Sequence, residues 1–290
     1  MPDYSDRFWT SRDGLKLHFR DYPGGQPGQP PLLCLPGLTR NARDFEDLAN
    51  RLAPRWRVLC PDLRGRGDSE YAKDAASYNP LQYADDIEAL VEAEALGGFV
   101  VIGTSLGGLL TMLLAARGTV SLKGAILNDV GPELDPAGIE RIRGYVGQGR
   151  NFPTWIHAAR ALEEVQAECV PHFEIGDWLA MAKRGMVVGS NGRIHFDYDM
   201  KIAEPFGQPD PNPAPDLWPA FEALAGRPVL LLRGALSDLL AADVHAKMAQ
   251  RLAGAAAITV AGVGHAPTLA EPEALAAIDV LLARVASTRT

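Results

Sequence analysis

The sequence GTSLGG at residues 103–108 constrains this chain more than any other segment. It lies between an all-apolar, strand-like run at residues 99–102 and an apolar helical run at residues 105–117. A strand that enters a helix with no connecting loop forces the residue at the junction into a strained, positive-φ conformation. Gly103 and Gly107 leave room for such a turn, so we expect the Ser105 hydroxyl to project from the strand end. The alternative is a glycine-rich turn that carries an incidental serine.

Short apolar runs alternate with helical patterns along the first 130 residues and again after residue 228. The runs predict strands at residues 15–22, 31–35, 57–61, 99–102, 123–128, 228–232 and 257–260. The helical patterns predict helices at residues 41–52, 80–96, 105–117, 241–252 and 271–285. Strands that are apolar on both faces and separated by amphipathic helices are typical of a parallel sheet covered on both sides. The expected fold class is therefore α/β.

The alternation stops between residues 132 and 216, where the chain becomes irregular and rich in aromatic residues. This stretch leads into a proline-rich segment, with six prolines among residues 204–219. A stiff, proline-rich exit is typical of the boundary between an insertion and its parent domain. We therefore expect a core domain formed by residues 1–131 and 217–290, and a lid formed by residues 132–216.

Composition and charge exclude several classes of protein. The formal net charge is −8 and no basic run interrupts it, so a nucleic acid would be repelled. The N-terminus lacks the apolar stretch of a signal peptide, and the longest apolar runs are too short to span a bilayer. Three scattered cysteines do not predict a disulfide framework, and no CxxC or HExxH spacing predicts a metal site. We expect a cytoplasmic protein with no metal, no cofactor and no membrane association.

A serine hydroxyl is a poor nucleophile unless a base removes its proton. Among six histidines, His265 stands out because it lies in the loop AGVGHAP, directly after the predicted strand 257–260. The base in turn needs a carboxylate that sets its tautomer. Asp238 follows the strand 228–232 in the turn RGALSD, and Asp129 ends the strand 123–128. We favour Asp238, because a Ser/Gly turn presents it at a strand end, and we keep Asp129 as the alternative acid.

Four segments resemble, in the same order, those of the α/β-hydrolase superfamily. They are PGL at residues 36–38, DLRGRGDS at 62–69, GTSLGG at 103–108 and GVGH at 262–265. The resemblance, to a cofactor-free serine hydrolase of the esterase or lactonase type, covers nearly all of the chain except the predicted lid. It implies a mostly parallel, eight-stranded sheet with helices on both faces and a helical lid. It also implies an oxyanion hole formed by the backbone N–H groups of Leu38 and Leu106. The chain departs from the family at Pro36, where the family usually has histidine.

The same resemblance narrows the reaction. Serine at position 105 argues against haloalkane dehalogenases and epoxide hydrolases, which place aspartate there. Typical carbon–carbon bond hydrolases of aromatic-ring cleavage carry a tryptophan near the position where this chain has Ala266. The resemblance therefore implies hydrolysis of a carboxylic ester or lactone of a small, largely apolar substrate, through an acyl-enzyme. A β-diketone-type carbon–carbon hydrolase or a perhydrolase with the same triad is one alternative. A non-catalytic ligand-binding protein is another.

Four residues are candidates for substrate contact. Phe152, Trp155 and Trp178 lie in the predicted lid and are candidates for the wall of an apolar pocket. Their alternative role is to form the small core of the lid itself. Arg40, two residues past the oxyanion turn, is a candidate for binding a substrate carboxylate, and the alternative is a solvated surface arginine.

Overall fold

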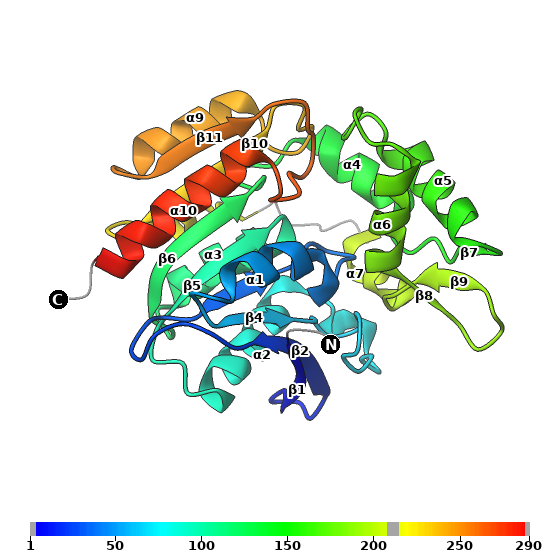
Figure 1. Cartoon of the computed structure of the whole chain (residues 1–290), viewed down its shortest axis with the longest axis horizontal. Coiled ribbons are helices and arrows are strands. Elements are labelled where there is room, and N and C mark those ends of the chain that lie inside the picture. Colours follow the sequence, from blue (N-terminus) through cyan, green and yellow to red (C-terminus); the bar gives the residue numbers. More distant parts are fainter. Residues whose placement is uncertain (1–3, 208–214, 288–290) are drawn as a thin grey trace.

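A single large sheet organises the computed structural model, which describes residues 4–207 and 215–287 (Figure 1). In this part of the chain the sheet has eight strands, in the order β1-β2-β4-β3-β5-β6-β10-β11. They are β1 (Ser5–Thr10), β2 (Lys16–Tyr22), β3 (Leu32–Leu35), β4 (Val58–Pro61), β5 (Phe99–Thr104), β6 (Leu122–Asn128), β10 (Val229–Gly234) and β11 (Ala256–Val260). Only the β1–β2 and β2–β4 pairs are antiparallel. The predicted α/β class and mostly parallel sheet are confirmed.

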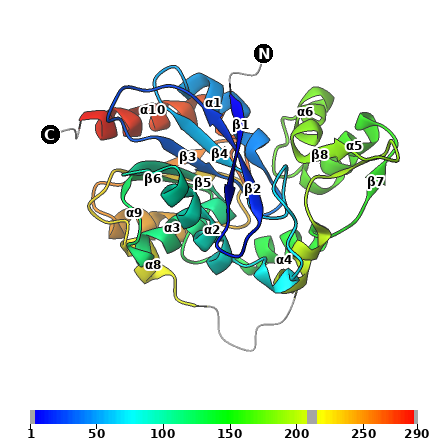
Figure 2. The ribbon, with the colours of Figure 1, turned by 90° about the horizontal axis from the view of Figure 1, so that it is seen from below.

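Helices cover both faces of this sheet (Figures 1 and 2). One face packs against α1 (Glu46–Leu52) and α10 (Pro272–Ser287). The other packs against α2 (Pro80–Ala93), α3 (Leu106–Arg117), α8 (Trp218–Glu222) and α9 (Ala242–Arg251). Because side chains alternate along a strand, Leu32 and Cys34 enter the first layer while Leu33 and Leu35 enter the second. The central strands are therefore buried on both faces, as their continuous apolar runs predict.

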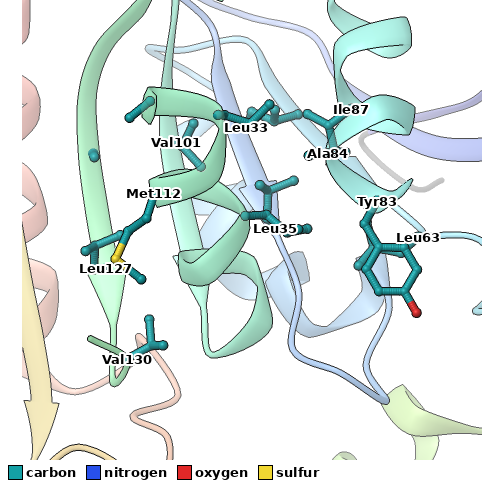
Figure 3. Close-up of a cluster of buried hydrophobic side chains, with 14 of the residues drawn as sticks. Leu33, Leu35, Leu63, Tyr83, Ala84, Ile87, Val101, Met112, Leu127 and Val130 are labelled. Carbon is teal, nitrogen blue, oxygen red and sulfur yellow. The ribbon is translucent and has the colours of Figure 1, made fainter. Parts of the chain in front are cut away.

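The second layer is drawn in Figure 3, where strand side chains meet helix side chains. Leu35 and Val101 from the sheet belong to the same buried cluster as Ile87 of α2 and Met112 of α3. This packing holds β5 against α3 on either side of the residue 105 turn. The strand–turn–helix unit is thus anchored on both arms.

Strand β1 is the one core strand that the sequence pattern did not indicate. Its residues are exposed except for Trp9, so it carries neither an apolar run nor a clean alternation. It lies at the edge of the sheet and is held by antiparallel pairing with β2. An edge strand that buries a single side chain leaves little signal in hydrophobicity.

Between β6 and α8 the chain forms a separate group of elements at one end of the sheet, which we call the insert (Figures 1 and 2). Its helices are α4 (Pro136–Tyr145), α5 (Trp155–Gln166), α6 (Ile175–Gly185) and α7 (Ala203–Gly207). It also holds a small antiparallel sheet, unpredicted from sequence, formed by β7 (Asn151–Phe152), β9 (Ile194–Phe196) and β8 (Met186–Val188). Residues 208–214 of the proline-rich exit lie outside the described residues.

Three short 3-10 helices complete the described elements. They are η1 (Ala42–Phe45), η2 (Ala75–Ser77) and η3 (Met200–Ile202). A search of the described residues finds no helix with the length and apolar character needed to cross a membrane.

Candidate active site

Ser105 adopts the strained conformation that its glycine neighbours predict. It has φ 52° and ψ −116° and directly precedes the first residue of α3. A Cβ atom on Gly103 would lie 2.4 Å from the Gly107 carbonyl oxygen, and one on Gly107 would lie 2.0 Å from the Leu35 carbonyl oxygen. Both positions therefore demand glycine, because the helix passes too close to the strands for any side chain. The packed core on both sides maintains the strain at Ser105.

The structure brings His265 against this serine. Its Nε2 atom lies 2.9 Å from Ser105 Oγ, and its side chain is only 8% exposed. The loop that carries it is held by two backbone contacts. The Gly264 N–H donates to the Cys169 carbonyl of the insert at 2.5 Å, and the Leu236 N–H donates to the Val263 carbonyl at 2.8 Å. The imidazole is therefore held by both the core and the insert.

Asp129 is the carboxylate on the other side of His265. It follows β6 in a left-handed conformation, with φ 55°, and is fully buried. Its Oδ2 lies 2.7 Å from His265 Nδ1 and accepts a 2.6 Å hydrogen bond from Ser237 Oγ. Its Oδ1 accepts the Gly234 N–H at 2.8 Å. Three donors thus hold one buried carboxylate in a single orientation.

The structure places Asp129 against His265, and not the favoured Asp238. Asp238 pairs with Arg141 of α4, whose Nη2 lies 2.9 Å from Asp238 Oδ1. The hydrogen bond from Arg141 lowers the pKa of Asp238. The physical reason lies in the sheet order: β6 lies next to β5, so Asp129 and Ser105 sit at adjacent strand ends. The turn after β10 instead directs Asp238 towards the insert.

The backbone N–H groups of Leu38 and Leu106 are free donors beside Ser105. Within the described chain neither has a hydrogen-bond acceptor. The Leu38 carbonyl, by contrast, accepts two bonds from Arg66, from Nε at 3.0 Å and Nη2 at 2.8 Å. Arg66 is completely buried, and its Nη1 lies 3.0 Å from the Tyr83 hydroxyl oxygen. This contact fixes the turn that carries the Leu38 N–H.

Sequence reasoning singled out neither Arg66 nor Ser237 for this region. Arg66 lies in the segment DLRGRGDS and Ser237 in the turn RGALSD, so both motifs were recognised. The missing information was which side chains in those turns point towards residue 105.

A cavity of about 180 Å³ opens above Ser105 and His265. The core lines it with Leu38 and Arg40, and the insert lines it with Tyr145, Met181 and Phe196, among others. The site is therefore a cavity between the carboxyl ends of the strands and the insert, as expected for a small-molecule site.

The aromatic residues predicted to wall this cavity lie elsewhere. Phe152, Trp155 and Trp178 are absent from its lining: Phe152 and Trp178 are buried inside the insert, and the partly buried Trp155 packs against the same cluster. Trp178 is 1% exposed and packs edge-on against Phe173, with ring centroids 5.1 Å apart. The interpretation as the insert's own core is the one that the structure supports. Their size makes them the natural filling for a small group of helices.

Arg40 does line the cavity, and it is not a solvated surface arginine. Its Nε and Nη2 both donate to the Asp44 carboxylate. The pair lies in and just before η1, directly after the turn that carries the Leu38 N–H.

Comparison with known proteins identifies the family to which the chain belongs. The sequence profile described as "Alpha/beta hydrolase family" matches residues 32–278. The chain belongs to the alpha/beta hydrolase family. It is 38% identical to 3-hydroxybutyrate-oligomer hydrolase from Cupriavidus necator, over 87% of this chain and 88% of that protein. It is 26% identical to 2-(acetamidomethylene)succinate hydrolase from Mesorhizobium japonicum, over 93% of both chains.

A solved structure of an alpha/beta hydrolase from Novosphingobium aromaticivorans is similar along almost the whole chain. The TM-score is 0.94 at 62% identity, covering 98% of this chain and 99% of that one. The family and these hydrolase relatives indicate an enzyme that hydrolyses a bond in a small molecule.

Proposed function

We propose that the chain is a serine hydrolase that cleaves a carboxylic ester or lactone through an acyl-enzyme. The observation that carries this proposal is one continuous line of contacts. Ser105 Oγ lies 2.9 Å from His265 Nε2, and His265 Nδ1 lies 2.7 Å from Asp129 Oδ2. In this proposal Ser105 is the nucleophile, His265 the general base and Asp129 the acid that orients the base.

The protonation states follow from the partners. An ionised carboxylate only accepts hydrogen bonds, so Asp129 places the imidazole proton on Nδ1. Nε2 is then unprotonated and accepts the Ser105 hydroxyl proton as Oγ attacks the substrate carbonyl carbon. The same proton passes from Nε2 to the leaving alkoxide. Water repeats the sequence on the acyl-enzyme and releases the acid and Ser105.

The charge that develops on the carbonyl oxygen needs donors that are already in place. The Leu38 and Leu106 N–H groups are free to supply them, and Leu106 also begins α3, where the helix dipole favours negative charge. The double hydrogen bond from Arg66 to the Leu38 carbonyl supports the orientation of the first donor. We therefore assign the oxyanion hole to these two N–H groups.

The insert serves, in this proposal, as a lid with the boundaries 132–216. Tyr145, Met181 and Phe196 contribute to the cavity wall opposite the strand ends. The ion pair between Arg141 of α4 and Asp238 ties the insert to a core loop. An apolar wall at this place keeps bulk water away from the acyl-enzyme.

Ester cleavage is favoured over carbon–carbon cleavage by two observations. Ala266 follows His265, where the ring-cleavage hydrolases of the superfamily place a tryptophan nearby. The relative at 38% identity is named as a hydrolase of 3-hydroxybutyrate oligomers. The hydroxyl and carboxyl groups of a hydroxy acid join through an ester bond, which is the linkage cleaved in this proposal.

The test is a comparison of Ser105→Ala with Ser121→Ala on p-nitrophenyl butyrate. Ser121 is an exposed serine just before β6 and serves as the matched control. We expect Ser105→Ala to lower kcat by about 10⁴-fold or more while circular dichroism shows an unchanged fold. A fluorophosphonate probe should label the wild type and Ser121→Ala, but not Ser105→Ala. Substantial activity in folded Ser105→Ala would refute the assignment.

A further inference from the structure

We propose that Arg40 binds a carboxylate of the substrate, so that the preferred substrates are esters carrying a free carboxylate close to the scissile bond. The inference rests on the proposed function and adds the class of substrate. Its evidence is the charge that lines the cavity, the geometry of the Arg40 guanidinium and the position of Arg40 relative to Ser105.

The charges around the cavity have the opposite sign to the protein as a whole. Among the described residues that line it, Arg40, Arg150 and Arg184 are cationic, and Asp44 is the one carboxylate. The whole chain carries a formal net charge of −8. A guanidinium group that faces a concave, partly apolar site is suited to bind a carboxylate there. A neutral, fully apolar substrate has no group that could bind these arginines.

Arg40 is held ready for a second partner. Asp44 occupies its Nε and Nη2, which leaves Nη1 without an acceptor in the described part of the chain. Nη1 lies against the end of α6, only 2.8 Å from where a Cβ on Gly185 would be. The Arg40 side chain is 23% exposed. A guanidinium fixed by one carboxylate loses little conformational freedom when its remaining donors bind another.

The arginine lies beside the reacting serine. A Cβ atom on Gly37 would lie 3.5 Å from Arg40 Cγ and 3.7 Å from Ser105 Cβ. The two side chains therefore flank Gly37 in the same small cavity. In this proposal a molecule that places its ester carbonyl at Ser105 extends along the same cavity to the Arg40 guanidinium.

Arg184, on the insert side of the cavity, is a second cation near Asp44. Its Nε lies 3.9 Å from Asp44 Oδ1 and its Nη1 lies 3.8 Å from Asp47 Oδ2, both beyond hydrogen-bond distance. It lies near the end of α6, on the insert side of the cavity. Arg40 and Arg184 thus share Asp44, Asp47 lies beside Arg184, and Arg150 lies 3.4 Å from Glu164. The donor left for a ligand is therefore Arg40 Nη1.

The first test uses the wild type alone. The two substrates are mono-p-nitrophenyl glutarate, which carries a free carboxylate, and its methyl ester, which does not. At neutral pH the free carboxylate is ionised. We expect kcat/KM to be higher for the acid by about 10-fold or more, because Arg40 Nη1 has no carboxylate to bind in the complex with the methyl ester. A methyl ester that reacts as well as the acid, in an enzyme that still depends on Ser105, would overturn this inference and leave the proposed function intact.

The second test removes the positive charge of residue 40. Arg40→Gln should reduce the acid-to-ester ratio of kcat/KM towards one, whereas Arg160→Gln should keep the wild-type ratio. Arg160 is an exposed arginine of α5 that pairs with Glu163 and serves as the matched control. Because Arg40→Gln leaves Asp44 without its partner, the double variant Arg40→Gln/Asp44→Asn repeats the measurement with no unpaired charge. A wild-type ratio in either folded variant would refute the role of Arg40.

Discussion

Replacement of Asp129 by asparagine tests the proposal that Asp129, and not Asp238, is the acid that orients His265. Asp129 accepts three hydrogen bonds, from the Gly234 N–H, the Ser237 hydroxyl and His265 Nδ1. Asparagine has the same shape but one oxygen and one NH₂ group. Asparagine also tolerates the left-handed backbone that Asp129 adopts at φ 55°. The variant should therefore fold.

The expected effect follows from the tautomer of His265. With the asparagine oxygen on the Gly234 N–H, the NH₂ group faces Ser237 and His265. The Ser237 oxygen already accepts the Leu239 and Leu240 N–H groups, so the NH₂ group turns to His265, which must present an unprotonated Nδ1. Its proton then lies on Nε2, which faces Ser105 and can no longer accept the hydroxyl proton. A wrong tautomer of this kind lowers kcat by about 10⁴-fold, or roughly 5.5 kcal/mol.

Asp238→Asn is the control variant, because Asp238 is the other carboxylate considered as the acid. This substitution breaks only the ion pair with Arg141, and the Asp238 side chain is 32% exposed. A partly exposed pair contributes little, so kcat should fall by less than about 10-fold. Both variants are measured for kcat and KM on p-nitrophenyl butyrate, with circular dichroism as the check on folding. The reasoning is refuted if kcat falls about a thousand-fold or more in Asp238→Asn while folded Asp129→Asn keeps a kcat close to that of the wild type.

Three further outcomes follow from contacts away from the nucleophile. Arg66→Met leaves the Leu38 carbonyl without its two donors, so we expect kcat to fall about 10-fold while KM changes less; an equal rise in KM would contradict the positioning role. Trp178→Ala leaves a cavity where the side chain is 1% exposed, so urea denaturation should show a free energy of unfolding lower by about 3–5 kcal/mol. The hydrogen bond from Arg64 lowers the pKa of Asp13 from 3.8 to about 2, so the folded state gains stability above pH 3.8 that it loses as the pH falls towards 2. Asp13→Asn should therefore reduce the fall in the free energy of unfolding between pH 3.8 and pH 2. An unchanged fall would contradict the lowered pKa of Asp13.

The sequence by itself was sufficient for the fold and for the position of the serine. The predicted core strands lie close to the observed ones, because strands buried on both faces need continuous apolar runs. The turn at Ser105 was equally readable, since the close approach of Gly103 and Gly107 to backbone oxygens excludes other residues. Strand β1 escaped notice because an exposed edge strand imposes no such requirement on its side chains.

Only the tertiary structure decided which partners the serine meets. Asp129 and Asp238 both follow strands, and the sequence carries no record of which side chain turns towards His265. That choice depends on β6 lying between β5 and β10 and on the salt bridge by which Arg141 engages Asp238. The same holds for the insert, whose aromatic residues became its own core while Arg40 came to line the cavity. Local patterns report what each segment must bury, whereas contacts between distant segments are set only when the layers pack together.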